Sequence, residues 1–345
     1  MGRLSQPILI AFTLLLIMSC QRLLISGSHP GFHSATQQLA SAECRVVQHP
    51  MGETCVPVEP KRVVALDPGF ILDPLLSLGI KPIGTTADFW RGTTYWWGLS
   101  PETVEGIEIV GQPNQPSLEK LLMIKPDLIL GLTDAEAYYA QLSAISPTVL
   151  IDSSEMLRHS FKRHWRVIAQ IIRKEVKAEK LISQYHQKIE ILKAKLKGRL
   201  AGKNVSVIWY TDDNFWAPTP NATFFQVLKD INVSISPAFL EKNSSLIPTS
   251  GIPFSTEVIS RYDADILFIC NPNRQSRAFL LKNPLISSLK AAQEKQLYVI
   301  ECLPWGTNGP SAINKLIDEL SQYLLKAAIN VEENQANRLK AFVQR

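Results

Sequence analysis

Short apolar runs bounded by Gly and Pro alternate with amphipathic stretches along most of the chain. In the first half, strands are predicted at 62–66, 81–86, 107–111, 127–131 and 148–152, and helices at 71–79 and 118–124. In the second half, strands are predicted at 204–210, 265–270 and 296–302, and helices at 221–231, 255–262, 283–293 and 311–328. This alternation is typical of an α/β fold with mainly parallel sheets.

The stretch from about 155 to 200 has no strand pattern. Six apolar residues recur there at spacings of three and four, as one buried helical stripe requires: Ala178, Ile182, Tyr185, Ile189, Leu192 and Leu196. Gly198 and Gly202 follow the stripe. The pattern predicts two Rossmann-like lobes, 44–165 and 201–345, joined by a single long rigid helix over 166–200, with only small lobe motion on ligand binding.

One motif occurs in both halves. Residues 117–130 read "SLEKLLMIKPDLIL" and residues 255–268 read "STEVISRYDADILF". In each, a Ser is followed two positions later by a Glu and ten positions later by an Asp that opens an apolar run. The repeat indicates two related lobes, whose parallel strands direct their carboxyl ends toward a shared ligand cleft.

Composition and charge narrow the function classes. The chain has 345 residues, 46% of them hydrophobic and 19% charged, which excludes a disordered chain and a multi-span membrane protein. The net charge of +5 is concentrated in 173–199, where nine Lys and Arg stand against three Glu. That segment lacks interleaved aromatics and base-reading motifs, so we interpret it as a solvated helix face and expect no nucleic-acid partner.

The N-terminus predicts export. Arg3 precedes an apolar core over 8–18 that is too short to span a membrane as a stable helix, and Ser19-Cys20 follows it. This ending resembles the bacterial lipoprotein signal, which implies a signal peptide over 1–19, lipidation of Cys20 and a flexible tether over 20–43. Cleavage after 40–42 is the alternative, but that site lies too far beyond the apolar core. We expect a periplasmic protein, lipid-anchored to a bacterial membrane.

Cysteine parity agrees with an oxidising compartment. Of five cysteines, four remain once Cys20 is set aside. Cys44 and Cys55 bracket a short loop and predict one disulfide. Cys270 and Cys302 end two similar apolar runs and would meet if those runs are neighbouring strands; buried free thiols are the alternative for this pair.

Aromatic and cationic residues gather where strands are predicted to end. Large rings suit apolar or planar ligand surface, and guanidinium groups suit anionic oxygens, although solvated loop arginines are the alternative for any one of them. Trp209 can equally be a core residue. The candidate ligand-binding residues are Trp90, Arg91, Trp97, Tyr210, Trp216, Arg274, Arg277 and Trp305.

The ordered set of motifs resembles the ferric-siderophore and cobalamin type of substrate-binding protein that serves ABC importers. The resemblance covers nearly all of 44–330, and the most discriminating part is the "NPLISSLKAAQEKQLYVI" stretch with the Trp305 segment after it. It implies a monomeric carrier, not an enzyme, that delivers a ferric siderophore to an inner-membrane permease dimer with its ATPase. A hydroxamate or citrate-hydroxamate is the favoured ligand, with iron carried inside the siderophore and no cofactor bound directly.

The resemblance also implies a docking role for two glutamates. In that family each lobe carries an exposed Glu that docks into arginine pockets on the permease, and by motif these residues are Glu119 and Glu257. The alternative is local, because Ser117 and Ser255 can cap helices whose positive ends favour a nearby Glu. The "CRVVQHPMGETC" loop at 44–55 departs from the family pattern.

The sequence bears on three alternatives to a siderophore-binding function. Bare-metal capture in a His-rich cleft shared between the lobes is excluded because all six His lie at or before residue 186. A haem or cobalamin carrier of the same fold stays open, with His49 as the only His in the strand-loop region of the first lobe. An exported enzyme is disfavoured because G-x-S-x-G, P-loop and G-x-G-x-x-G motifs are absent and Asp212-Asp213 reads as a turn.

Overall fold

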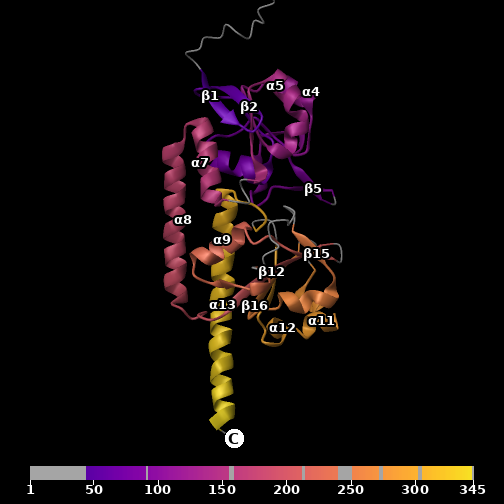
Figure 1. Ribbon diagram of the computed structural model, residues 1–345, viewed down its shortest axis with the longest axis vertical. Helices are drawn as coiled ribbons and strands as arrows, with labels where there is room; N and C mark the ends of the chain where they lie inside the picture. Colours follow the sequence, from indigo (N-terminus) through magenta and orange to yellow (C-terminus); the bar gives the residue numbers. More distant parts are fainter. Residues whose placement is uncertain are drawn as a thin grey trace, which may run out of the picture. The chain divides into compact units, whose positions relative to one another are not determined.

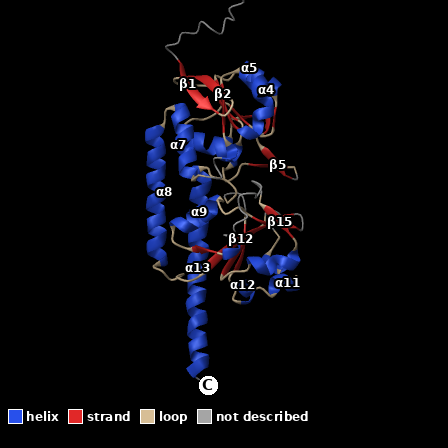
Figure 2. Cartoon of the chain, viewed as in Figure 1, coloured by secondary structure: helices blue, strands red, loops and turns tan. Residues whose placement is uncertain are grey.

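The computed structural model describes residues 44–90, 92–154, 159–211, 214–239, 251–271, 275–301 and 305–343 (Figures 1 and 2). The side chains of Trp90 and of residues 334–343 are not described. Outside the described residues lie the predicted signal peptide (1–19), Cys20, the tether (20–43), Arg91, the 212–213 pair, Arg274 and Cys302. Residues Cys44–Arg345 form one compact unit.

The first lobe contains a parallel five-stranded sheet in the order β11-β10-β3-β4-β7. These strands are β3 (Val63–Ala65), β4 (Gly84–Thr85), β7 (Glu108–Ile109), β10 (Leu128–Leu132) and β11 (Thr148–Ile151). The helices of this lobe are η1 (Pro68–Leu72), α2 (Asp73–Ser77), α3 (Pro101–Val104), α4 (Leu118–Ile124), η2 (Thr133–Tyr138) and α5 (Tyr139–Ile145). Two small antiparallel pairs complete it, β5 (Asp88–Trp90) with β6 (Thr93–Tyr95) and β8 (Gly111–Gln112) with β9 (Gln115–Pro116).

The second lobe has a mixed sheet in the order β15-β13-β12-β16-β17, with β14 also paired to β12. Its strands are β12 (Asn204–Thr211), β13 (Asn214–Ala217), β14 (Ser234–Ile235), β15 (Ile252–Phe254), β16 (Ile266–Cys270) and β17 (Leu297–Ile300). Strands β14 and β16 pair in parallel with β12, and β17 pairs in parallel with β16. Strand β13 is antiparallel to β12, and β15 is antiparallel to β13. The prediction of an α/β fold with mainly parallel sheets in two lobes is confirmed.

Short helices connect the strands of the second lobe. They are α9 (Thr223–Asp230), η3 (Pro237–Phe239), η5 (Thr256–Tyr262), α10 (Arg277–Leu280), α11 (Pro284–Ser287) and α12 (Lys290–Gln293). The single helix predicted over 283–293 is in fact α11 and α12, which are separated because Leu289 adopts an extended backbone conformation. The terminal helix α13 (Pro310–Val343) is longer than the predicted 311–328.

The connector differs from the prediction in one respect. It consists of two helices, α7 (Phe161–Ile172) and α8 (Glu175–Leu196), and not of one continuous helix over 166–200. Arg173 breaks the run because its backbone is left-handed, with φ of 56°. The predicted stripe is confirmed in full: the six buried residues of α8 are the six named from the sequence.

The two repeated aspartates do the same structural job in each lobe. The Asp127 carboxylate accepts hydrogen bonds from the backbone N–H of Lys61 and Arg62, at 2.7 and 2.9 Å, just before β3 begins. The Asp265 carboxylate accepts one from Asn204 N–H at 3.0 Å, at the start of β12. Each Asp precedes the strand that pairs with β3 or β12. The repeat therefore fixes the start of the central strand pair in both sheets.

The loop that departs from the family pattern is a hairpin of β1 (Cys44–His49) and β2 (Gly52–Pro57). The predicted Cys44–Cys55 disulfide is confirmed, with the two Cα atoms 5.6 Å apart. The hairpin lies against β11, an edge strand of the first sheet. Thr54 Oγ1 donates to Thr148 O at 2.9 Å, and Leu150 N–H donates to His49 Nδ1 at 3.4 Å. Side chains of the hairpin thus bond to backbone groups that an edge strand would otherwise leave open.

None of the helices in the described part of the chain combines the length and apolar content that crossing a membrane requires.

Candidate functional site

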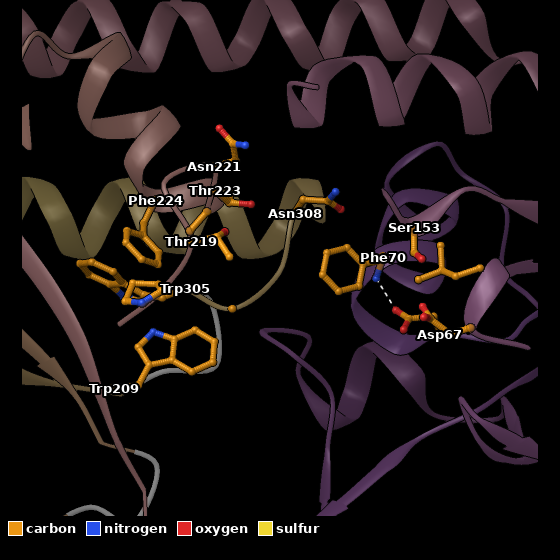
Figure 3. A pocket seen from close by; sticks show the side chains of 15 residues that line it. Asp67, Phe70, Ser153, Trp209, Thr219, Asn221, Thr223, Phe224, Trp305 and Asn308 are labelled. Atoms are coloured by element: carbon orange, nitrogen blue, oxygen red, sulfur yellow. Dashed lines mark hydrogen bonds between the residues drawn. The ribbon is translucent and has the colours of Figure 1, made fainter. Parts of the chain in front are cut away.

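A cleft of about 310 Å³ is lined by residues of both lobes. Its first-lobe wall comes mainly from segments that follow β3, β10 and β11, and its second-lobe wall from Trp209 on β12 and from segments that follow β13 and β17. Most of these segments follow the carboxyl ends of parallel strands, as expected for ligand sites in open α/β sheets. Figure 3 shows Trp209, Phe224 and Trp305 on one side and Asp67, Phe70 and Ser153 on the other.

The second-lobe wall is aromatic. Trp305 is 1% exposed, its indole donates to Glu319 Oε2 at 2.7 Å, and its ring lies 5.9 Å from that of Phe224. Burial raises the pKa of Glu319, and the indole hydrogen bond opposes that rise. Trp209, at the end of β12, is half-buried, and its Nε1 has no hydrogen-bond partner among the described residues. This wall therefore offers ring surface and one open N–H donor.

The first-lobe wall is acidic. Asp67 lies two residues after the end of β3 and caps η1, accepting from the N–H groups of Gly69 at 2.9 Å and Phe70 at 2.5 Å. Burial is the main cause that raises the pKa of Asp67 to about 7; the negative charges of Asp88 and Asp134 act in the same direction, and these two hydrogen bonds act against it. Asp134 lies exposed on the same wall.

Asn308 lies between the two walls (Figure 3). It is 3% exposed, and its Oδ1 has no hydrogen-bond partner among the described residues. Its backbone carbonyl accepts from Trp165 Nε1 at 2.7 Å, which holds this segment against α7. A buried amide oxygen without a partner is costly, so Asn308 Oδ1 is suited to accept a hydrogen bond from a ligand group.

The structure distributes the predicted aromatic residues over several environments. Trp305 lines the cleft. Trp97 donates its indole N–H to the Asp88 carboxylate, and its ring packs so closely on Gly306 that a Cβ there would lie 2.7 Å from it. Tyr210 is 8% exposed, its ring packs at a tilt of 39° against that of Phe215 with the centroids 4.8 Å apart in the core of the second lobe, and it is not among the residues that line the cleft.

Trp216 and Trp90 are two further predicted ligand-binding residues, and the structure describes the side chain of only the first. Trp216 is half-buried on β13, directly opposite Trp209 in the strand pair, and is not among the residues that line the cleft. The backbone of Trp90 ends β5, while its side chain lies outside the described part.

The described residues place one of the three predicted arginines away from the cleft. Arg277 opens α10, and its Nε donates to Leu297 O at 3.0 Å, at the outer edge of β17. Its guanidinium thus bonds to the protein's own backbone, in a separate hollow beside Tyr323 and Glu301. Arg91 and Arg274 fall outside the described residues.

Sequence reasoning missed Asp67, Phe70 and Asn308, and treated Trp209 as a possible core residue. The signal that could have found Asp67 and Trp209 is position, since each stands at the carboxyl end of a central parallel strand. Asn308 carries no comparable signal, because its burial depends on contacts with α7, which lies far away in the sequence.

Both predicted docking glutamates are exposed, in the first turns of α4 and η5. Their surroundings differ. Ser117 Oγ accepts from Lys120 N–H at 3.4 Å and caps α4, whereas the side chain of Ser255 makes no cap. Instead, a hydrogen bond with Ser255 lowers the pKa of Glu257.

Cys270 is disulfide-bonded, which argues against a free thiol at this position. It lies opposite Ile300 in the β16–β17 pair. Ile300 precedes Cys302, the predicted partner of Cys270, by two residues. Cys302 is outside the described residues, so the pairing stays a prediction. Across the residues that the structure does describe, no group of three His, Cys, Asp or Glu side chains could hold a metal ion.

Comparison with known proteins agrees with this architecture. The probable siderophore-binding lipoprotein YfiY of Bacillus subtilis (strain 168) is 29% identical, over 88% of this chain and 95% of its own. The Fe(3+)-citrate-binding protein YfmC of the same organism is 29% identical, over 86% and 90%. The crystal structure of Staphylococcus aureus SirA complexed with staphyloferrin B superposes with a TM-score of 0.67 at 25% identity, covering 81% of this chain and 98% of SirA.

Residues 90–302 match the family model described as "Periplasmic binding protein". That span is more than half of the chain, and it takes in β10 and β11 of the first sheet and the strands of the second sheet from β12 to β17. The chain therefore belongs to the periplasmic binding protein family.

Proposed function

We propose that this protein is the siderophore-binding component of an ABC importer, which captures a ferric siderophore in the cleft and delivers it to a membrane permease. The observation that carries the proposal is the cleft itself, which has an aromatic wall, a facing wall from the other lobe, and lining residues with buried polar atoms that lack a hydrogen-bond partner among the described residues. Relatives over most of the chain are named for siderophore and ferric citrate binding, which supports this ligand class.

The chemistry of the cleft suits a metal that arrives already coordinated. A siderophore surrounds ferric iron with its own oxygens, so the protein needs to recognise the outside of the complex and supplies no metal ligands. Trp209 and Trp305 provide ring surface, while Trp209 Nε1 and Asn308 Oδ1 provide one donor and one acceptor. A hydroxamate or citrate-hydroxamate ligand, with Arg91 and Arg274 bonding its anionic oxygens, is the finer form of the proposal.

Tryptophan fluorescence of the purified protein tests this function. Titration with ferric citrate, ferric staphyloferrin B and ferrioxamine B should quench the emission for at least one complex, because rings in the cleft contact the ligand. A response to haem or cobalamin, with none to the ferric siderophores, would favour the carrier of the same fold that binds those ligands. Unchanged tryptophan fluorescence with every one of these compounds would refute the proposal.

A pair of variants tests which tryptophan reports the ligand. Trp209 and Trp216 are paired residues on adjacent strands, but only Trp209 lines the cleft. Trp209→Phe should weaken both quenching and affinity, and Trp216→Phe should leave the affinity unchanged. Weaker affinity in Trp216→Phe, with unchanged affinity in Trp209→Phe, would indicate that Trp216 and not Trp209 contacts the ligand.

The proposal includes membrane attachment through Cys20 and permease docking through Glu119 and Glu257. Two carboxylates on separate lobes provide a two-point contact that favours orientation and association rate. Replacing both by Ala should abolish uptake of the iron complex and leave its affinity intact, whereas Glu105→Ala, another exposed first-lobe glutamate, should change neither. Loss of ligand affinity in the double variant would contradict the docking role.

A further inference from the structure

Asp73 is a fully buried carboxylate that contacts no described cation. It opens α2 in the first lobe and is 0% exposed. Its Oδ1 accepts from Ser311 N–H at 3.1 Å, and its Oδ2 accepts from Ala312 N–H at 3.0 Å. Ser77 Oγ, one turn along, also donates to Oδ1 at 3.1 Å. Burial raises the pKa of Asp73, and these donors act against the rise.

The two backbone donors belong to the first turn of α13. The first N–H groups of a helix lack partners within it and form the positive end of its dipole, so a carboxylate there is stabilising. Helix caps normally come from the residue just before the helix. Here the cap is 238 residues away in sequence and belongs to the other lobe.

The segment just before α13 forms part of the cleft. Trp305, Gly306 and Asn308 all line it. Figure 3 shows Asn308 between the two walls, at the point where the chain enters α13. The position of the first turn of α13 therefore sets where these three residues lie.

Close packing fixes this segment onto the first lobe at several points. A Cβ on Gly309 would lie 2.1 Å from Asp73 Oδ2, so only glycine lets the chain pass the carboxylate. A Cβ on Gly69 would lie 2.6 Å from Thr307 Oγ1. With the hydrogen bond from Trp165 to Asn308 O, the segment has little freedom to move as long as Asp73 holds its end.

We propose that Asp73 is a positioning residue for ligand binding: by capping α13 from the opposite lobe, it fixes residues 305–309 as one wall of the cleft. The inference rests on the proposed function, since ligand affinity is its consequence. Asp73 itself does not line the cleft.

The second lobe offers a matched control. The Asp263 carboxylate also accepts from two consecutive N–H groups at a helix start, those of Lys290 at 2.6 Å and Ala291 at 3.3 Å on α12. Neither Asp263 nor α12 lines the cleft. Asp73→Asn and Asp263→Asn thus remove similar caps, and only the first affects the binding wall.

The full-length protein, purified in detergent, should be compared as wild type, Asp73→Asn and Asp263→Asn at a temperature where circular dichroism shows all three folded. Titration with the ferric complex that quenches the wild type should give a Kd raised about tenfold for Asp73→Asn and less than about twofold for Asp263→Asn, because only the former loses a preorganised wall. Equal affinities in the two variants would overturn the inference.

Hydrogen exchange of the ligand-free protein gives a second readout, independent of the proposed function. Asp73→Asn should speed exchange across 305–312, and Asp263→Asn should speed it only around 290–291. Unchanged exchange at 305–312 would overturn the positioning role even if no ferric complex binds. Should Asp73→Asn fail to fold, Gly309→Ala, which places a methyl group against the same carboxylate, should produce the same faster exchange and weaker binding.

Discussion

In both lobes a side chain bonds to a backbone carbonyl on an edge strand of the sheet, but the side chains come from unrelated segments. Thr148 of β11 and Leu297 of β17 are equivalent, because each pairs with the residue two positions after the repeated Asp. Both strands lie at one end of their sheets. The carbonyl of Thr148 accepts from Thr54 Oγ1 at 2.9 Å, and that of Leu297 accepts from Arg277 Nε at 3.0 Å. One lobe uses a disulfide-closed hairpin, and the other uses a single arginine.

This difference shows which features of a lobe the repeat specifies. The Asp that fixes the central strands occurs in both lobes, whereas the edge is bonded by residues that have no counterpart in the other lobe. An edge carbonyl needs only one donor, which many local sequences can supply, while pairing of the central strands demands a carboxylate at one position. The hairpin therefore covers the edge of the first sheet, and Arg277, which is unrelated to it in sequence, bonds the equivalent edge carbonyl of the second sheet.

The largest effect should come from removing the hairpin's constraint. Replacing Cys44 and Cys55 together by Ala should lower the free energy of unfolding by about 3 kcal/mol, since a short closed loop is lost. Urea unfolding of the double variant, with wild type under the same non-reducing conditions, measures this. A loss well below about 1 kcal/mol would mean that the hairpin is held by its hydrogen bonds alone.

The repeated aspartates come next and should not be equal. Asp265 is 8% exposed, and Lys203 and Lys290 also donate to it, at 3.1 and 2.7 Å. The half-buried Asp127 accepts instead from the backbone N–H groups of Lys61 and Arg62. Burial alone would raise the pKa of Asp265, but these donors outweigh it and the pKa is lowered. Asp265→Ala should cost about 2–3 kcal/mol of unfolding free energy and Asp127→Ala about 1 kcal/mol. Equal losses would show that the lysines add nothing.

Asp67 on the acidic wall of the cleft predicts a pH dependence of the free energy of unfolding. Asp67 has an ordinary pKa of 3.8 that is raised to about 7 in the folded protein, so folding takes up a proton between these values. Its stabilising contribution is present at low pH and lost as pH rises to about 7, by at most about 1.4 kcal/mol per pH unit. Asp67→Asn should remove this slope from urea midpoints measured between pH 5 and 7. Asp134→Asn, on the same wall but exposed, should retain it.

The smallest effects should come from the two edge donors. Thr54→Val and Arg277→Met each leave one edge carbonyl without its side-chain donor and should cost about 1 kcal/mol of unfolding free energy. Neither should change affinity for the ferric complex. A clear loss of affinity in Arg277→Met would place that guanidinium at the ligand after all and break the equivalence with Thr54.

Strong periodic patterns made much of the fold predictable. The α8 stripe, the central strands of both sheets and the Cys44–Cys55 pair all follow from local spacing, and a binding protein rather than an enzyme is confirmed by family membership. The break at Arg173 was missed because a left-handed Arg leaves no mark on the hydrophobic pattern.

The cleft was harder to predict than the fold. Rings and guanidinium groups look alike in sequence whether they face a ligand or their own protein, so Tyr210 and Arg277 could not be told apart from Trp305. Asp73 and Asn308 depend on contacts across more than 140 residues, which no local spacing reveals.

The three aspartate contacts also differ in how far apart their partners are along the chain. Asp127 and Asp265 each accept from backbone N–H groups 61 to 66 residues away, inside one lobe. Asp73 accepts from the N–H of Ser311, at a helix start 238 residues later in the sequence. Contacts between distant residues carry a larger loop-closure cost and form late, and domains of a growing chain fold from the N-terminus onward. We therefore expect each lobe to assemble on its own, with the joining of Asp73 to α13 as the closing step of folding.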